Sequence, residues 1–354
     1  MRRLIALLVA APLAAQPVVP GKEWSRWEKP EAAGYSAKRL DAVRGWVGTI
    51  GTTAMMVVVG GRPVFEYGDL AHLSYLASVR KSILAMLYGK YVANGTIDLN
   101  KTLKEIGLND KQGLMERELE AKVEHLIAAR SGVYHPASNS GDNTDSAPPR
   151  GSQKAGSYYL YNNWDFNAAG AVFEKLTGVD IHDALEKDLA QPLGMQDFDR
   201  ARQRKSGNPE KSQHMAYHMW LSTRDMARVG LLMQREGDWG GRQVIPREWA
   251  RRIASLVTPL GDMNPPSLRS LGNATRWGYG YMWWVWDAPA NAAGPFRGAY
   301  TGMGAVGQYI TVLPALDMVV AHKTDPEQRR AVSQGEFMAT LHLLIASRCS
   351  GPCS

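Results

Sequence analysis

The stretch LASVRKSILAMLYG, residues 76–89, decides how the rest of the chain is interpreted. It places Ser78 three residues before Lys81, at the point where a helical pattern begins. From Val79 onward apolar residues recur at helical spacing, and Asn94-Gly95 supplies a C-terminal stop. Ser78 is therefore either an ordinary helix cap, whose side-chain oxygen accepts backbone N–H groups, or part of a chemical site.

The spacing of Ser78 and Lys81 suits nucleophilic chemistry. Residues three apart on a helix lie on one face, so the amine can reach the hydroxyl. A serine hydroxyl is a weak nucleophile until a neighbouring base takes its proton, and burial near a helix N-terminus favours the neutral, basic form of a lysine. Arg80 points to a different side and is not expected to share this role. Because about one S-x-x-K is expected by chance in a chain of this composition, the pair needs support from elsewhere.

Composition limits the class of protein. The 354 residues are 45% hydrophobic and 21% charged, which is typical of a soluble globular protein with a large core. The formal net charge is +7, but the basic residues are scattered, apart from RARQRKSGNPEK (200–211), whose turn residues indicate a solvated loop. Aromatic and basic residues do not interleave as in nucleic-acid-binding proteins, so we expect no nucleic-acid partner.

The first 15 residues, MRRLIALLVAAPLAA, have the order of a secretory signal peptide: two arginines, an apolar run and small residues. The run is too short to cross a bilayer, which needs roughly 20 apolar residues, and no other stretch is long enough. We therefore expect residues 16–354 to form a periplasmic or secreted protein with no stable membrane span. A buried N-terminal helix is the alternative.

Both cysteines, Cys349 and Cys353, lie in the closing CSGPC. An exported chain could join them in a small disulfide loop, and a frayed tail is the alternative. Two thiols are too few for a metal site. His214 and His218 are four apart, as helix-borne metal ligands can be, but the glutamate of H-E-x-x-H is absent. Nucleotide-binding glycine motifs are also absent, so we expect no metal and no cofactor.

Strand patterns occur at both ends of the chain. TTAMMVVVGGRPVFEYGD (52–69) has two β-rich runs around Gly60-Gly61 and predicts a hairpin. Strand character returns in RWGYGYMWWVWD (276–287) and GQYITVLPALDMVVAHKT (307–324), before a final helical stretch. One sheet made from distant parts of the chain is therefore predicted. The expected division is an α/β part, about 16–96 and 236–348, and an inserted, mainly helical part, about 97–235.

Several later stretches resemble the serine β-lactamase and penicillin-binding-protein superfamily. Tyr161-Asn162-Asn163 resembles the Y-x-N element of its class C-like branch. LSTRDMARVG (221–230) and WGYGYMWWV (277–285) are similar to the STxRDxAR helix and GYGWW strand of esterase and amidase members, and ARSGV (129–133) is similar to their HTSG turn. YTGMGAVGQYITVLPALDMVV (300–320) resembles the later strand with its glycine-rich edge. The resemblance covers roughly residues 30–345.

This resemblance implies a fold and a set of roles. The fold is α/β (α+β), serine β-lactamase/transpeptidase-like, with an antiparallel sheet flanked by helices and an inserted, mainly helical domain. Ser78 would be acylated and Lys81 would activate it. Tyr161 would exchange protons with the leaving group and the hydrolytic water, with a pKa lowered beside the buried lysine. Asn163 would orient Lys81 or a substrate amide. A core aromatic residue is the alternative for Tyr161.

The same resemblance implies an oxyanion hole made from the nucleophile and the glycine-rich strand edge. Two registers fit. Tyr300-Thr301-Gly302 in the place of K-T-G would give the Met303 N–H, whereas Met303-Gly304-Ala305, counted back from Gly307-Gln308, would give the Ala305 N–H. We favour the second, because G-x-x-G-Q before a strand resembles the nylon-oligomer hydrolases and related esterases. Glycines that only permit a bulged or closely approached strand are compatible with either.

One departure from the family bears on the substrate. No K-T-G is present, and the nearest match is KTD at Lys323. The cation that grips the drug carboxylate in β-lactamases is therefore missing from its expected place, and recognition would fall to another residue such as Arg297. We expect a carboxylesterase or amidase that acts on a small ester, amide or short peptide. The alternatives are a β-lactamase or D-amino-acid peptidase, and a non-catalytic peptidoglycan- or partner-binding protein of the same fold.

Overall fold

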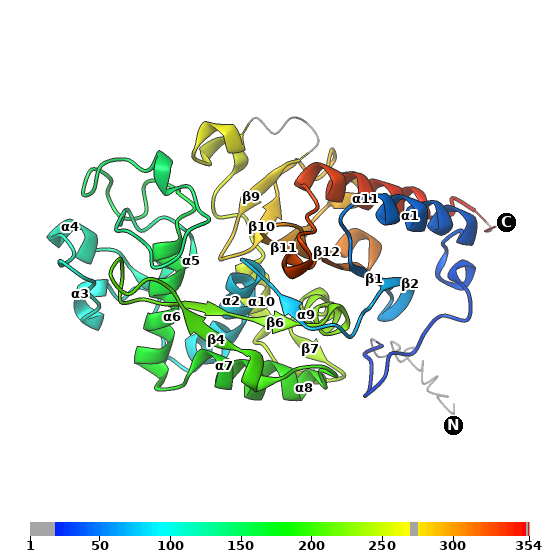
Figure 1. The fold of residues 1–354 in the computed structure, drawn as a ribbon, viewed down its shortest axis with the longest axis horizontal. Coiled ribbons are helices and arrows are strands. Elements are labelled where there is room, and N and C mark those ends of the chain that lie inside the picture. Colours follow the sequence, from blue (N-terminus) through cyan, green and yellow to red (C-terminus); the bar gives the residue numbers. More distant parts are fainter. Residues whose placement is uncertain (1–17, 270–274, 352, 354) are drawn as a thin grey trace, which may run out of the picture.

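A seven-stranded sheet forms the centre of the structure, a computed structural model that describes residues 18–269, 275–351 and 353. The predicted leader lies outside these residues. The strand order is β2-β1-β13-β12-β11-β10-β9, and neighbouring strands pair antiparallel, as predicted (Figure 1). The strands are β1 (Ala54–Val59), β2 (Arg62–Gly68), β9 (Trp277–Tyr279), β10 (Trp284–Trp286), β11 (Tyr300–Gly304), β12 (Gln308–Leu313) and β13 (Met318–Lys323).

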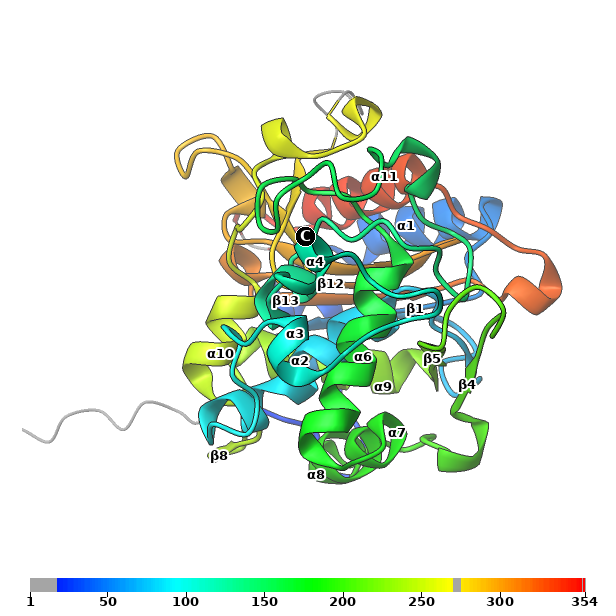
Figure 2. The ribbon, with the colours of Figure 1, turned by 90° about the vertical axis from the view of Figure 1, so that its left-hand side faces the viewer.

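Helices cover the sheet and fill most of the remaining chain. They are α1 (Ala37–Thr49), α2 (Val79–Ala93), α3 (Leu103–Ile106), α4 (Glu116–Leu119), α5 (Val123–Ile127), α6 (Asn163–Thr177), α7 (Ile181–Ala184), α8 (Gln191–Leu193), α9 (Thr223–Gln234), α10 (Arg247–Ile253) and α11 (Gln334–Ala346). A π-helical segment, Leu185–Ala190, joins α7 to α8. Figure 2 looks onto this helical part, with α3, α6 and α7 in front.

Within the described residues, three short two-stranded ribbons lie outside the main sheet, and the sequence patterns did not predict them. They pair β3 (Ser74–Tyr75) with β6 (Trp220–Leu221), β4 (Arg204–Ser206) with β5 (Ala216–His218), and β7 (Asp238–Trp239) with β8 (Arg242–Gln243). Each strand has only two or three residues, which is too short to establish an alternating pattern. The first ribbon is important for the site, because β3 leads directly into the turn before Ser78.

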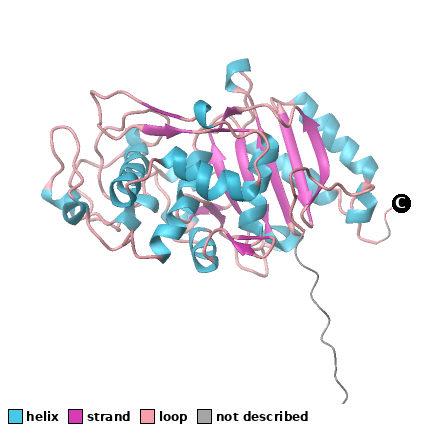
Figure 3. Cartoon of the chain, turned by 90° about the horizontal axis from the view of Figure 1, so that it is seen from below, coloured by secondary structure: helices cyan, strands magenta, loops and turns pink. Residues whose placement is uncertain are grey.

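The sheet is buried on both faces. Met55 and Val57 of β1 belong to a core shared with α1 and α11, whereas Met56 and Val58 belong to the core shared with α2 and α9. Successive side chains of a strand point to opposite faces, so an uninterrupted apolar run such as AMMVVV can serve both cores. In Figure 3 the strands of the main sheet lie between helices on either side.

The helix α9 packs on the main sheet, although the predicted division placed it in the inserted part. Gly230 lies so close to β12 and β13 that a Cβ atom there would be 2.4 Å from Val319 Cγ1. Buried Arg228 donates to the backbone oxygens of Leu193, at 2.7 Å, and Lys22, at 2.9 Å. The STRDMAR motif therefore joins the sheet, the end of α8 and the start of the described chain, which is a structural role.

The C-terminal cysteines are bonded to each other. The disulfide joins Cys349 to Cys353, and the Cys349 N–H donates to Gly34 O at 2.9 Å. This contact ties the end of α11 to the segment that precedes α1. Among the described residues, no helix is long and apolar enough to cross a membrane.

Replacing Gly230 by alanine tests the close packing of α9 on the sheet. A Cβ atom at 2.4 Å from Val319 Cγ1 must displace the helix, so Gly230→Ala should lower the free energy of unfolding by about 1–3 kcal/mol. Gly45→Ala is the matched control, because Gly45 lies inside α1 and a Cβ atom added there would have no heavy atom of another part of the structure within 4 Å. This variant should gain about 0.5–1 kcal/mol in free energy of unfolding from helix propensity. Urea unfolding of both variants measures the difference. Equal stability of the two would contradict the packing described.

Candidate active site

Ser78 lies at the start of α2 and does not act as a helix cap. Its backbone is helical, at φ −76° and ψ −8°, and its side chain makes no capping hydrogen bond to the backbone N–H groups in the first turn of α2. The preceding Ala77 has φ 48°, a left-handed conformation that costs a non-glycine residue about 1 kcal/mol or more. This strained turn between β3 and α2 presents the Ser78 hydroxyl to a cavity.

Lys81 is at the centre of the site. Its side chain is buried, and Nζ lies 3.1 Å from Ser78 Oγ, 2.7 Å from Tyr161 Oη and 2.7 Å from Asn163 Oδ1. A neutral amine has two N–H donors and one lone pair. It can therefore donate to Tyr161 and Asn163 and accept the proton of Ser78.

The surroundings of Lys81 favour this neutral form. Burial lowers the pKa of Lys81 well below its ordinary value, and the positive charge of Arg80 lowers it further, while Asp142 opposes both. As predicted, Arg80 points elsewhere: its guanidinium lies 4.4 Å from the centre of the Tyr217 ring and donates to Asn167 Oδ1 at 3.3 Å. Its charge nevertheless acts on the lysine, which the sequence interpretation did not foresee.

Tyr161 is a buried, protonated phenol. Burial raises its pKa to about 12, and the neighbouring Ser78 hydroxyl and the charge of Arg80 only partly offset this. The predicted lowering of this pKa is therefore wrong, because the ring is enclosed by Phe166, at 4.8 Å between ring centres, and Trp284, at 5.7 Å. Near neutral pH the Tyr161 hydroxyl can donate a proton in its resting state.

Asn163 holds Lys81 in place from the first residue of α6. Its Oδ1 accepts from Lys81, its Nδ2 donates to Ser140 O at 2.9 Å, and its backbone N–H donates to Asp142 Oδ2 at 2.6 Å. The preceding Asn162 caps α6 through its side chain. The oxygen and the nitrogen of the Asn163 side-chain amide are thus both hydrogen-bonded within the protein. This geometry favours a role for Asn163 in orienting Lys81 over contact with a substrate amide.

The glycine-rich edge of β11 forms the opposite wall of the cavity. Met303, Gly304 and Ala305 line it together with Ser78. Thr301 is buried and its hydroxyl is bonded to Thr311 Oγ1 at 2.8 Å, while Gly302 packs against α2, where an added Cβ would be 2.9 Å from Ser82 Oγ. These two candidate residues therefore face other parts of the structure.

Close approach between β11 and the Ser78 turn requires a glycine at 304. A Cβ atom on Gly304 would be 2.5 Å from the backbone oxygen of Leu76. Ala305 follows the last paired residue of β11, and its N–H has no acceptor among the described residues. A free N–H in the cavity wall is what the second register requires of an oxyanion donor.

The cavity has a volume of about 640 Å³, and its described lining contains no lysine or arginine. The residues that line it are Ser78, Gly141, Tyr161, Trp284, Met303, Gly304, Ala305, Val306, Gly307, Tyr309, Ala331, Val332, Ser333, Gln334 and Glu336. Lys323 does not reach it, because its buried Nζ donates to Ser74 O and Leu221 O, each at 2.7 Å. Burial lowers the pKa of Lys323 to about 7. Arg297 is exposed and also lies outside this lining.

Asp142 and Trp284 contribute to the site without having been predicted from the sequence. Asp142 comes from the long polar loop before α6, whose path no periodicity predicts, and it was not singled out as chemically important. Trp284 belonged to a recognised motif, but only the pairing of β10 with β9 and β11 shows that its ring reaches Tyr161. The candidate metal pair is not on a helix: His218 ends β5 and bonds Tyr75 Oη through Nδ1 at 2.8 Å, and His214 bonds Asn109 O at 2.9 Å.

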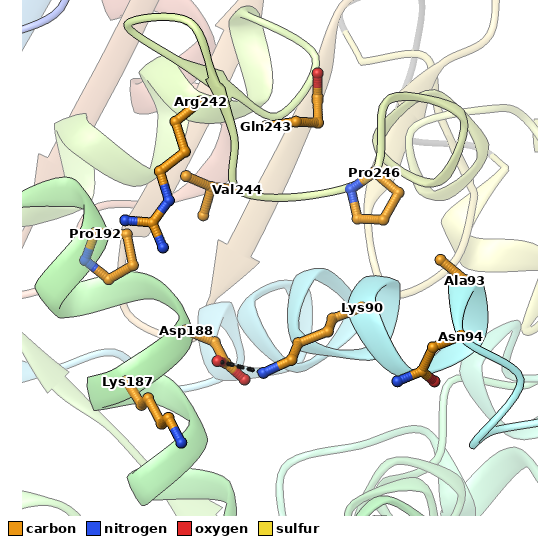
Figure 4. A pocket seen from close by; sticks show the side chains of 10 residues that line it. All are labelled: Lys90, Ala93, Asn94, Lys187, Asp188, Pro192, Arg242, Gln243, Val244 and Pro246. Atoms are coloured by element: carbon orange, nitrogen blue, oxygen red, sulfur yellow. Dashed lines mark hydrogen bonds and ion pairs between the residues drawn. The ribbon is translucent and has the colours of Figure 1, made fainter.

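A second cavity of about 420 Å³ lies at the far end of α2, between the π-helical segment and the β7–β8 ribbon (Figure 4). Lys90 and Asp188 form an ion pair across it at 2.9 Å, and Arg242 extends along the wall that Pro192 forms. It does not include Ser78, Lys81 or Tyr161. The chemistry described above therefore belongs to the 640 Å³ cavity.

Comparison with known families agrees with this geometry. The family model Beta-lactamase matches residues 41–332, which is most of the chain. The chain therefore belongs to the Beta-lactamase family. An uncharacterized protein from Alkalihalophilus pseudofirmus is 24% identical over 108 residues, a match that spans only 29% of this chain and 29% of that relative.

Solved structures share the fold at low sequence identity. A putative 6-aminohexanoate-dimer hydrolase from Bacillus anthracis superposes with a TM-score of 0.65 at 17% identity, over 93% of this chain and 87% of that one. A penicillin-binding protein homologue from Caulobacter crescentus gives 0.61 at 15% identity, over 89% and 99%. A class C beta-lactamase gives 0.60 at 15% identity, over 88% and 97%. At these identities the likeness concerns the fold.

The influence of Arg80 on the pKa of Lys81 predicts how the labelling of Ser78 depends on pH. The rate at which a fluorophosphonate labels Ser78 should rise with pH as Lys81 loses its proton, with a midpoint well below the ordinary lysine pKa. Arg80→Gln removes a positive charge that disfavours the ammonium form, so the midpoint should move to higher pH. Stopped labelling with mass spectrometry across the pH range measures both midpoints.

Two controls accompany this measurement. Arg297→Gln removes an exposed positive charge outside the cavity lining and should leave the midpoint unchanged. Circular dichroism of Arg80→Gln checks that the buried substitution has not unfolded the chain. A midpoint that stays in place, or moves to lower pH, in the folded variant would show that Arg80 does not set the pKa of Lys81.

Proposed function

We propose that this protein is an exported carboxylic ester or amide hydrolase that works through a Ser78 acyl-enzyme. The single observation that carries the proposal is the arrangement around Lys81, whose Nζ lies within 3.1 Å of Ser78 Oγ, Tyr161 Oη and Asn163 Oδ1 in a buried site. A buried amine with its charge disfavoured is a base in contact with a nucleophile. Retention of all these groups argues against a non-catalytic binding protein.

In the first half-reaction the Ser78 oxygen attacks the substrate carbonyl carbon while its proton passes to Lys81. The oxyanion that forms is held by the N–H groups of Ser78 and Ala305. When the C–O or C–N bond to the leaving group breaks, the Tyr161 hydroxyl donates a proton to that group. The Lys81 ammonium, 2.7 Å away, then restores the proton to Tyr161.

Water completes the cycle. It attacks the carbonyl carbon of the acyl-enzyme, and Lys81 accepts its proton directly or through the Tyr161 hydroxyl. The bond between the acyl carbon and Ser78 Oγ breaks, and the proton returns to that oxygen. Because the pKa of Tyr161 is about 12, the phenol is a relay in this scheme and Lys81 is the base.

The cavity wall supports an ester or amide substrate over a β-lactam. Recognition of a drug carboxylate calls for a cation beside the glycine-rich strand. Among the described residues of that wall there is none, and the nearest sequence match, Lys323, is bonded to two backbone oxygens elsewhere. The Bacillus anthracis neighbour bears the name of a 6-aminohexanoate-dimer hydrolase, and a dimer of that amino acid is joined by an amide bond.

Export is the remaining part of the proposal. The first 15 residues have the order of a signal peptide, which supports a periplasmic or secreted location. The bonded cysteines near the C-terminus agree with an oxidising compartment.

Acylation of Ser78 is the direct test of the proposed function. The mature chain mixed with p-nitrophenyl butyrate should gain the mass of a butyryl group on Ser78 and release p-nitrophenol continuously. Ser78→Ala should lose the adduct, and Lys81→Met should react about 10²–10⁴-fold more slowly, because the general base is gone. Absence of any adduct in the folded wild-type chain would argue for a binding protein.

Nitrocefin separates the esterase or amidase from a β-lactamase. Without a cation in the cavity wall, we expect kcat/KM for nitrocefin to be at least about 100-fold below that for the ester, as the loss of a charge-assisted contact or two would give. Initial rates under the same buffer conditions provide the comparison. Faster turnover of nitrocefin than of the ester would instead assign a β-lactamase.

A further inference from the structure

The cavity beside Ser78 has a distinct electrostatic character. Glu336 is the one side chain with a formal charge among its described lining residues. It lies in the first turn of α11 and is partly buried. The catalytic lysine adds little positive charge, since burial favours its neutral form. A substrate that enters this cavity therefore meets a negative wall.

Capping of α11 explains only one oxygen of this carboxylate. Glu336 Oε2 accepts from the Ser333 backbone N–H and from Ser333 Oγ, each at 2.7 Å, in a capping box. These hydrogen bonds lower the pKa of Glu336, so the group is ionised at neutral pH. Oε1 has no partner among the described residues, and no lysine or arginine of the described chain forms an ion pair with it.

Aromatic rings stand in the same cavity lining as this carboxylate. Tyr309 is stacked on Phe337, with ring centres 3.7 Å apart and planes 3° apart, and Phe337 directly follows Glu336. Trp284 lines the cavity as well, with its ring held against Tyr161. Aromatic side chains and a carboxylate in one lining suit a cation with an apolar surface, such as an alkylammonium group, because the carboxylate attracts the charge and the rings pack against the alkyl groups.

We propose that Glu336 selects substrates that carry an ammonium group on the acyl or leaving-group side of the scissile ester or amide bond. The inference rests on the proposed function and specifies its substrate class. It is the reverse of the carboxylate recognition that a β-lactam requires. The formal net charge of +7 would by itself attract anions, but exposed charges farther away than about 10 Å are screened at 0.1 M salt, whereas Glu336 acts on the substrate from the cavity lining itself.

Matched esters test the charge preference. One series varies the leaving group: acetylthiocholine, its neutral isostere 3,3-dimethylbutyl thioacetate, and S-acetyl-3-mercaptopropionate. A second varies the acyl group: p-nitrophenyl esters of 4-(trimethylammonio)butanoate, 5,5-dimethylhexanoate and succinate. In one of the series, kcat/KM for the cationic ester should exceed that for the neutral one about five- to tenfold, with the anionic ester slowest.

The variant Glu336→Gln isolates the charge, because glutamine also completes a capping box. Its cationic-to-neutral ratio of kcat/KM should fall to about one, because KM for the cationic ester rises when the negative charge is removed. Glu248→Gln is the matched control, since it removes an exposed carboxylate on α10, and it should keep the wild-type ratio.

The outcomes separate this inference from the function on which it rests. Acylation of Ser78 by all the esters without a cationic preference in either series overturns the inference alone. A preference that persists in Glu336→Gln also overturns it, because another group would then carry the selectivity. Failure of every ester to acylate Ser78 in the folded chain overturns the proposed function and the inference together.

Discussion

The whole site depends on keeping one amine out of water. Lys81 is buried beside three oxygen atoms, and the energy required to place a charge there makes its neutral form accessible. The rest of the arrangement serves this environment: α2 carries the lysine, the start of α6 supplies Asn163, and the rings of Tyr161 and Phe166 lie about 4 Å from Nζ. Arg80, although directed away from the site, adds a charge that disfavours protonation further. The nucleophile is thus activated by an enclosure that several elements build together.

Much of the site could be predicted from sequence because its residues occur in short local patterns. The S-x-x-K helix, the Y-x-N element and the hairpin at Gly60-Gly61 each depend on neighbours within a few positions, so the fold class and the group around Lys81 followed from them. Prediction was weaker where a role depends on distant chain segments. The orientation of Thr301 and the contribution of Asp142 are set by strand pairing and by the path of a polar loop. The pKa of Tyr161 was predicted in the wrong direction because its enclosing rings come from separate elements.

The glycine-rich edge shows how two parts of the site constrain each other. Gly304 lies against the backbone of Leu76, next to the strained Ala77 that leads to Ser78. The N–H of Ala305 and the nucleophile are therefore positioned by one contact between β11 and the turn before α2. By contrast, Glu336 and the α11 side of the cavity do not take part in this contact. Substitutions on the α11 side can therefore change substrate preference without disturbing the packing of Gly304 against the Leu76 backbone, which positions the groups needed for acylation.

The order of strands in the sheet has a consequence for how the protein is made. The strand β1 pairs with β13, and buried Thr52 meets His322 across 270 positions of sequence. The β1–β2 hairpin emerges early during synthesis, yet its partner is among the last segments to be added. Native contacts of such long range form slowly, and the central sheet cannot close until nearly the entire chain exists. The sheet edge that leads to Ala305 is therefore completed only near the end of synthesis, so the active site is assembled late.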